Sequence, residues 1–121
     1  MHLRLTIEQA VLTARLLDND TSRDFASLLP LTLTLGDFHA TEKISDLPRR
    51  LSATDASPGT DAEAGDIAYY APWGNLALFY RDSEYAPGLV KLGTIDSGTE
   101  ILAAIDDEFT VTIDIADGDT A

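Results

Sequence analysis

Residues 65–80 read GDIAYYAPWGNLALFY, and this stretch decides the fold. Two apolar runs flank a Pro-Trp-Gly-Asn turn that contains the chain's single tryptophan, Trp73. Proline and glycine favour tight turns, and aromatic residues favour the strands on either side of such a turn. The stretch therefore predicts a β-hairpin at the centre of a small barrel.

Alternating apolar residues predict further strands on both sides of this hairpin. Side chains of an extended chain point to opposite faces in turn, so a strand with one buried face is apolar at every second position. The last strand shows this most clearly, with Phe109, Val111 and Ile113 on one face and threonines between them. The expected strands are residues 3–7, 10–17, 31–35, 89–95 and 109–115, with a short edge strand over 46–51.

Two short helices are expected between these strands. Thr21 and Ser97 are the predicted N-caps, because a hydroxyl can accept a hydrogen bond from the first turn and an acidic residue follows three positions later. The segments assigned from these and weaker signals are helices over 21–29 and 98–104, a helical turn over 41–44, a surface loop over 52–64 and a polar bend over 81–88. Gly93, inside an expected strand, predicts a bulge or a close backbone approach.

The count of about eight short strands and two short helices predicts a mainly β fold. Closing an antiparallel sheet into a barrel removes the exposed edges that invite aggregation, so a closed barrel is favoured over an open sheet. A length of 121 residues fits a single domain over residues 1–121.

Composition limits the classes of partner. Twenty-one acidic and eight basic residues give a net charge of −13, which disfavours nucleic acid as a partner. There is no cysteine, which excludes disulfides, a thiol nucleophile and a cysteine metal site. The sequence lacks the roughly 20 consecutive apolar residues of a membrane span, so no membrane association and a cytoplasmic location are expected.

Three segments together resemble the cyclophilins. Residues 21–28, TSRDFASL, are similar to a Thr-x-x-Asn-Phe-x-x-Leu first helix, and residues 90–98, VKLGTIDSG, to a Val-Phe-Gly-x-Val-x-x-Gly strand and turn. The hairpin stretch 65–80 lies between them, as it does in that family. The whole chain more closely resembles small prokaryotic cyclophilin-like proteins of unassigned function. This resemblance implies an eight-stranded barrel capped at each end by a helix.

The resemblance does not extend to the catalytic segment of true cyclophilins. Their Phe-x-Arg-x-x-x-x-Phe-x-x-Gln-Gly-Gly-Asp run corresponds here to residues 43–51, KISDLPRRL. Arg49 and Arg50 could supply the arginine, but the glutamine and the Gly-Gly-Asp turn are missing. The resemblance therefore implies a retained scaffold whose catalytic interval has changed.

Candidate ligand-binding residues are Arg49, Arg50, Tyr70, Trp73 and Asn75. Trp73 and a tyrosine could line a cleft, although aromatic residues of a hairpin more commonly serve packing. One arginine could hold a carboxylate or a peptide carbonyl, whereas pairing with surface carboxylates is the simpler role. Asn75 fits either a contact to ligand or a turn residue with positive φ.

Other chemistry-bearing residues form no recognisable site. His39 has no second metal ligand at a defined spacing and is expected in a solvated loop. The acidic run 106–108 lacks the pattern of a calcium loop, and no serine has a nucleophile setting. We therefore predict no catalytic residue, no metal and no cofactor.

Three functions follow as hypotheses. The first is a non-catalytic module that binds a small molecule or short peptide in a cleft between the hairpin and the Arg49-Arg50 segment. The second is a peptidyl-prolyl cis-trans isomerase with a divergent active site. The third is a homo-oligomer or a partner-docking domain.

Overall fold

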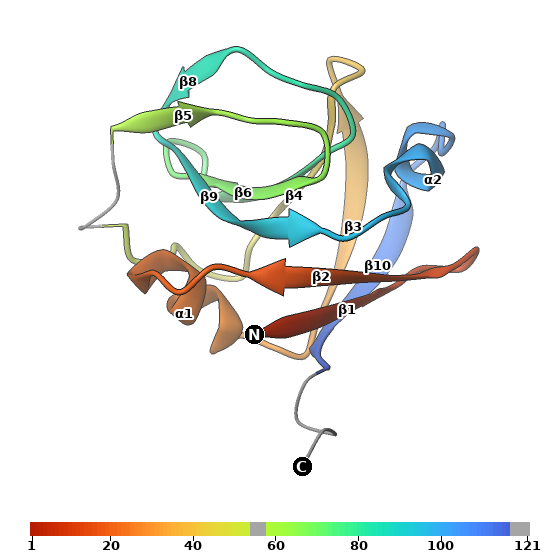
Figure 1. Ribbon diagram of the computed structural model, residues 1–121, viewed down its shortest axis with the longest axis horizontal. Helices are drawn as coiled ribbons and strands as arrows, with labels where there is room; N and C mark the ends of the chain where they lie inside the picture. The colour runs from red at the N-terminus through yellow and green to blue at the C-terminus, as the bar shows by residue number, and fades with distance from the viewer. Residues whose placement is uncertain (54–57, 117–121) are drawn as a thin grey trace.

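The protein folds into a closed antiparallel barrel with a small ribbon on its outside (Figure 1). The structure is a computed structural model that describes residues 1–53 and 58–116. Its elements in chain order are β1 (His2–Thr6), β2 (Val11–Leu16), α1 (Asp20–Ala26), β3 (Leu31–Phe38), β4 (Glu42–Asp46), β5 (Gly59–Asp61), β6 (Asp66–Tyr70), β7 (Asn75–Phe79), β8 (Tyr85–Pro87), β9 (Leu89–Ile95), α2 (Thr99–Ala103) and β10 (Phe109–Ile115).

Eight of the described strands close the barrel in the order β1-β10-β3-β4-β7-β6-β9-β2, and β5 pairs with β8 in the separate ribbon. Every pairing in the barrel is antiparallel. The predicted mainly β, eight-stranded antiparallel barrel is therefore confirmed.

Aliphatic side chains from alternate strand positions fill the barrel. Leu3, Leu5, Leu35, Leu76 and Leu78 are among those that are at most 1% exposed. Burial of such side chains is the main favourable term in folding, at about 25 cal/mol for each Å² of apolar surface removed from water. The period of two along the strands thus places one face of each in the core.

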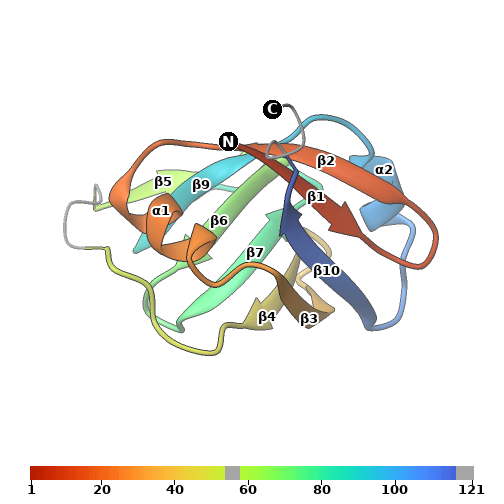
Figure 2. The same ribbon diagram turned by 90° about the horizontal axis from the view of Figure 1, so that it is seen from below.

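The two helices lie at opposite ends of the barrel, as Figure 2 shows. Phe25 of α1 and Leu102 of α2 are buried in the main apolar core. Each helix contributes a large apolar side chain to its end of the barrel, which confirms the expected capping. No helix in the described part of the chain is long and apolar enough to cross a membrane.

The central hairpin is confirmed, and both of its faces are covered. Tyr69 and Leu76 point into the barrel, whereas Ala68, Ala77 and Phe79 belong to a second apolar cluster on the outside. The β5–β8 ribbon lies over this outer face (Figure 1). Ala86 of β8 and Ala62, which follows β5, contribute to the cluster. Double coverage explains why the two runs are continuously apolar instead of alternating.

Two predicted elements between residues 41 and 51 are wrong. Residues 42–46 form strand β4 instead of a helical turn, and the edge strand expected over 46–51 is absent beyond Asp46. β4 pairs with β3 and β7, and Lys43, not an apolar residue, occupies its deeply buried position. A charged residue at an inward position hides the alternation on which strand prediction depends.

The surface loop expected over 52–64 contains strand β5, and the bend over 81–88 contains β8. Residues 54–57 of that loop lie outside the described residues. Ribbon strands of three residues leave too short a pattern to be recognised.

Both predicted helix caps are wrong by one or two residues. Asn19, not Thr21, caps α1, and its side-chain oxygen accepts a 2.8 Å hydrogen bond from the Ser22 N–H. Gly98, with φ of 97°, precedes α2, so Ser97 does not cap it. Asparagine and glycine are both favoured at caps, and tertiary packing decides between adjacent candidates.

Gly93 shows both features that were predicted for it. The pairing of β6 with β9 shifts register between Ile67 and Ala68, opposite Gly93. A Cβ atom built on Gly93 would lie 2.2 Å from the Arg15 carbonyl oxygen. Glycine is therefore required where β9 pairs closely with β2.

Candidate functional site

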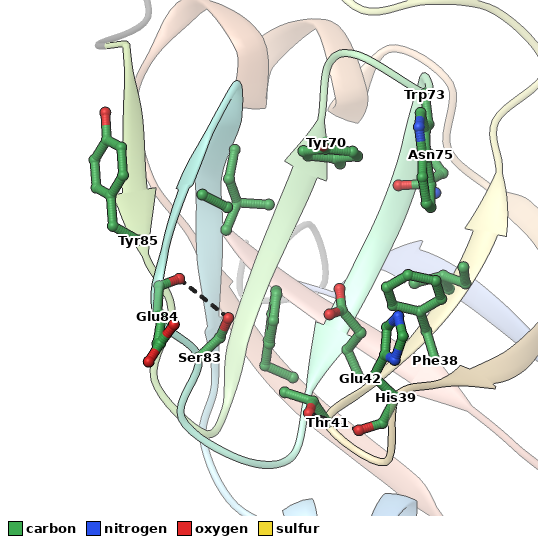
Figure 3. A pocket seen from close by; sticks show the side chains of 14 residues that line it. Phe38, His39, Thr41, Glu42, Tyr70, Trp73, Asn75, Ser83, Glu84 and Tyr85 are labelled. Carbon is green, nitrogen blue, oxygen red and sulfur yellow. Dashed lines mark hydrogen bonds between the residues drawn. The ribbon is translucent and has the colours of Figure 1, made fainter.

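A cavity of about 540 Å³ opens on the outer face of the hairpin, between the β3–β4 turn and the segment that leads into β8. Figure 3 shows its lining, with Phe38 and His39 on one side and Ser83, Glu84 and Tyr85 on the other. The size is within the range of natural small-molecule sites. We call this cavity the hairpin pocket.

Strand register positions the hairpin residues of this pocket. Tyr70 pairs with Asn75 across the hairpin, and both point away from the barrel because Tyr69 and Leu76 point into it. The turn between them brings Gly74 to a φ of 69°. Trp73 lies in this turn and remains 54% exposed, so one side of the pocket is an exposed aromatic ring.

Three aromatic rings meet at nearly right angles beside the pocket. The Trp73 ring lies 5.3 Å from the Tyr70 ring with an interplanar angle of 83°, and 5.5 Å from the Phe38 ring at 90°. Edge-to-face contacts of this kind are favourable and hold the rings in fixed orientations. The pocket therefore has an ordered aromatic corner, made by Phe38, Tyr70 and Trp73.

Asn75 supplies a buried polar group. Its residue is 3% exposed, and its side-chain oxygen Oδ1 accepts no hydrogen bond from any described residue. The expected positive φ is wrong: Asn75 begins strand β7, and the left-handed conformation belongs to Gly74. An unpaired buried acceptor is uncommon in proteins and destabilises the fold by about 1–3 kcal/mol.

Glu42 brings a carboxyl group into the pocket. It pairs with Phe79 of β7 and Phe38 of β3, so alternation directs it outward from the barrel. Burial raises the pKa of Glu42 to about 7 from an ordinary 4.5, with a further contribution from the negative charge of Asp37. The carboxyl group thus changes charge near neutral pH.

The two predicted arginines lie away from the hairpin pocket. The Arg49 guanidinium donates hydrogen bonds of 2.8 and 3.0 Å to the Asp24 carboxylate. Arg50 donates a 2.7 Å hydrogen bond to the Ala71 carbonyl oxygen and lies against Gly74. The structure therefore groups Tyr70, Trp73 and Asn75 around the pocket but leaves Arg49 and Arg50 outside it.

Several residues that line the pocket are not among the predicted candidates, including Phe38, Glu42, Glu84 and Tyr85. Their segments show no clear periodicity, so nothing in the sequence indicated which faces they present. His39 is exposed, as expected for a loop residue, but it also lines the pocket and its ring contacts Phe38 at 4.1 Å. The positive φ of His39 and Ala40 marks the tight turn that brings Glu42 back beside Phe38.

A second cavity of about 760 Å³ lies between the β1–β2 turn and the segment from Ala104 to Thr112. Glu8, Asp106, Asp107 and Glu108 line it, and it has no aromatic corner. Within the described residues, no group of three His, Asp or Glu side chains is placed to hold a metal ion. The hairpin pocket is therefore the stronger candidate site.

Comparison with known proteins agrees with this architecture. A model of the cyclophilin-like family matches residues 5–114. The solution structure of a hypothetical protein from Archaeoglobus fulgidus is similar, with a TM-score of 0.67 and 23% identity over 96% of this chain and 95% of that one. A search of curated proteins gave no significant match. At 23% identity the structural likeness concerns the fold alone, whereas the family match spans most of the sequence. The chain belongs to the cyclophilin-like family.

Proposed function

We propose that this protein is a cytoplasmic binding module that holds a small molecule or a short peptide in the hairpin pocket without chemical turnover. The observation that carries the proposal is the side chain of Asn75. Its oxygen is buried and accepts no hydrogen bond from any described residue, although it borders an aromatic cavity. A ligand N–H or O–H group bound there would satisfy this acceptor.

The aromatic corner supports the same function. Phe38, Tyr70 and Trp73 offer apolar surface at fixed angles, and Trp73 is half exposed. A ligand that stacks on these rings would remove apolar area from water without ordering flexible side chains. Preorganised walls of this kind favour binding because little conformational entropy is lost.

The isomerase alternative has less support. Arg49 is held by Asp24, and Arg50 is held by the Ala71 carbonyl oxygen. Among the described residues that line the pocket there is no lysine or arginine, so no guanidinium faces a peptide bound there. A donor to the proline nitrogen would have to come from another group, and we therefore place binding ahead of turnover.

Thermal-shift and calorimetric screening against metabolites and short blocked peptides tests the proposal. A true ligand raises the melting temperature by mass action and changes the fluorescence of Trp73, the single tryptophan. We expect Trp73→Ala to weaken binding by about tenfold or more, and Leu17→Ala, an exposed apolar truncation elsewhere, to leave binding unchanged. Binding of equal strength in Trp73→Ala, or no ligand from either library, would contradict the proposal.

A prolyl-peptide isomerisation assay on the same preparations separates the two functions. Binding without a rate gain at micromolar protein supports a module without turnover. A rate gain that Trp73→Ala abolishes would instead favour the isomerase.

A further inference from the structure

We propose that the group bound in the hairpin pocket is an organic cation, an ammonium or guanidinium that carries N–H donors on an apolar body. This inference rests on the proposed function and specifies the chemistry of its ligand. Three features of the pocket support it: the charge of its lining, the orientation of its aromatic rings and the set of acceptors that it presents.

Among the described residues that line the pocket, two are acidic and His39 is the one basic residue. Glu42 and Glu84 both line the pocket, and no described lysine or arginine does. Lys43, the residue after Glu42, is directed to the other face of β4, where its Nζ contacts Asp37 and the Ile105 carbonyl oxygen. The two glutamates would therefore repel a bound anion, whereas they would attract a cation.

The aromatic corner suits the same charge. The faces of aromatic rings carry partial negative charge and attract cations within about 6 Å. Trp73 and Tyr70 meet at 83°, and Figure 3 shows the Glu42 carboxyl on the open side of the corner that these two rings make. A cation placed there would contact ring faces and a carboxylate together.

The acceptors specify which cation fits. The Asn75 oxygen is buried and accepts no hydrogen bond from a described residue, and the carboxylate form of Glu42 adds further acceptors. A quaternary ammonium has no N–H group and would leave Asn75 unsatisfied. A primary ammonium or a guanidinium has several donors and could satisfy both residues.

The charge of Glu42 makes binding depend on pH. The titratable or charged groups around it are Asp37, His39, Tyr70, Tyr80, Glu84 and Tyr85, with Lys43 on the opposite side of the strand. Burial and Asp37 raise the pKa of Glu42 to about 7, so this group gains its negative charge as the pH rises through neutrality. Cation binding should strengthen over the same interval.

Calorimetry with three probes that share one apolar body provides the test. Phenethylammonium is the cation, phenethyl alcohol its neutral counterpart and phenylacetate its anionic counterpart. We expect the cation to bind at least about tenfold more tightly than either counterpart, and more tightly at about pH 8 than at about pH 5.5. An alcohol or a carboxylate that binds as tightly as the amine would overturn the inference.

Matched variants separate the pocket from the acidic surface, since a chain with a net charge of −13 attracts cations everywhere. Glu42→Gln should weaken phenethylammonium binding by about tenfold and remove its pH dependence. Glu8→Gln removes the same charge beside the second cavity and should change binding by less than about twofold. Equal binding in Glu42→Gln and in the unmodified protein would overturn the inference.

Urea unfolding checks that each variant is folded. If Trp73→Ala is unstable, Trp73→Leu provides a second variant without the aromatic ring.

Blocked tripeptides with a central lysine or norleucine test whether the cation can come from a peptide. Binding of the lysine peptide identifies a peptide side chain as a source of the cation, and binding of the free amine alone identifies a small molecule; either result supports the inference.

Failure of this inference can be told from failure of the proposed function. A neutral or anionic compound from the wider screen could bind in a Trp73-dependent manner while phenethylammonium and the lysine peptide do not. That result would support the proposed binding module and reject an organic cation as its ligand. If no compound of any charge binds in a Trp73-dependent manner, both proposals are wrong.

Discussion

The Nζ atom of Lys43 lies 3.2 Å from a carboxylate oxygen of Asp37, although the lysine side chain is only 1% exposed. The same nitrogen donates a 2.5 Å hydrogen bond to the Ile105 carbonyl oxygen, just after α2. Strand alternation links this buried pair to the candidate site, because directing Lys43 inward directs the adjacent Glu42 outward to the hairpin pocket. The pair thus contributes both to the barrel core and to the position of a pocket residue.

Replacement of Lys43 by alanine is expected to lower the free energy of unfolding by about 2–4 kcal/mol. The variant removes a buried aliphatic stem and leaves the Asp37 carboxylate without its counter-ion. Burial tends to raise the pKa of Asp37, but hydrogen bonds from Tyr80 and the Ala40 N–H, together with Lys43, outweigh it and lower the pKa. Asp37 would therefore remain charged in the variant at neutral pH.

Urea unfolding at neutral pH measures this loss. Lys43→Met keeps most of the apolar stem and should cost clearly less than Lys43→Ala, by about 1 kcal/mol or more. Equal stability of Lys43→Ala and the unmodified protein would show that the buried pair contributes nothing net.

Glu42→Gln should make the protein more stable at alkaline pH. The folded pKa of about 7 is above the ordinary 4.5, so the stabilising effect of the protonated carboxyl is complete below pH 4.5 and is lost as the pH rises through 7. The amide of glutamine does not titrate and avoids this loss. We expect equal stabilities near pH 4 and an advantage of about 1–3 kcal/mol for the variant near pH 8.

Urea unfolding across that pH range provides the measurement, with Glu8→Gln as the control for removal of one negative charge elsewhere. Parallel pH profiles for Glu42→Gln and the unmodified protein would mean that the Glu42 carboxyl is not perturbed.

The stability that Asp24 contributes should depend on pH in the opposite direction to that of Glu42, since it is lost when the pH falls. Hydrogen bonds from Arg49 and then from the Ser52 N–H lower its pKa to about 2 from 3.8. The stabilisation is therefore complete above pH 3.8 and is lost as the pH falls through about 2. Asp24→Asn should lower the free energy of unfolding by about 1 kcal/mol at neutral pH, since the partly exposed pair is screened by solvent. Below about pH 4, the stability of the variant should depend less on pH than that of the unmodified protein.

Acid titration followed by circular dichroism tests this expectation. Asp46→Asn, the control, changes an exposed carboxylate at the end of β4. It should leave the unfolding curve at acid pH unchanged. If Asp24→Asn and the unmodified protein lost their folded structure over the same range of acid pH, the stabilising role assigned to the Asp24–Arg49 pair would be contradicted.

The fold could be predicted from the sequence because most barrel strands follow simple physical patterns. Residues such as Leu3, Leu5, Val111 and Ile113 alternate with polar neighbours, and each of them is buried in the barrel. The hairpin was recognisable from its turn, where proline precedes the tryptophan and glycine adopts a positive φ. Local chemistry and the global fold agree in these segments.

Prediction failed where a buried residue is charged or an element is very short. Lys43 occupies a core position that the pattern reserves for an apolar residue, so the sequence predicts a helical turn over 41–44 where the structure has β4. Of the candidate site residues, those on the hairpin could be placed together because they are close in sequence. Glu42 is placed against the hairpin by the pairing of β4 with β7, and Tyr85 is placed by the pairing of β8 with β5. No local sequence pattern reveals either pairing.

Gly93→Ala should destabilise the barrel because a Cβ atom there would lie 2.2 Å from the Arg15 carbonyl oxygen. Backbone atoms on both strands would have to separate, and overpacking of this kind costs about 1–3 kcal/mol or more. Gly36→Ala is the matched control in β3, since its Cβ would meet only the Glu108 side chain at an ordinary 3.7 Å. Chemical unfolding of both variants makes the comparison, and equal stabilities would contradict the close approach of β2 and β9.

Replacement of Asn75 by valine should separate stability from binding. The buried Asn75 oxygen accepts no hydrogen bond from a described residue, so an apolar, strand-favouring side chain should raise the free energy of unfolding by about 1 kcal/mol. If the hairpin pocket binds a ligand as proposed, the same variant should weaken that binding, because the Asn75 acceptor is removed. Such a gain in stability with a loss of binding is typical of residues retained for function.

Asn19→Val provides the matched comparison for Asn75→Val. The Asn19 oxygen accepts a 2.8 Å hydrogen bond from the Ser22 N–H at the start of α1, so its removal should lower stability by about 1 kcal/mol and leave binding intact. Urea unfolding should therefore show a higher free energy of unfolding for Asn75→Val and a lower one for Asn19→Val. If Asn75→Val were instead as destabilising as Asn19→Val, the Asn75 amide would have a structural role in the free protein, and the observation that carries the binding proposal would be lost.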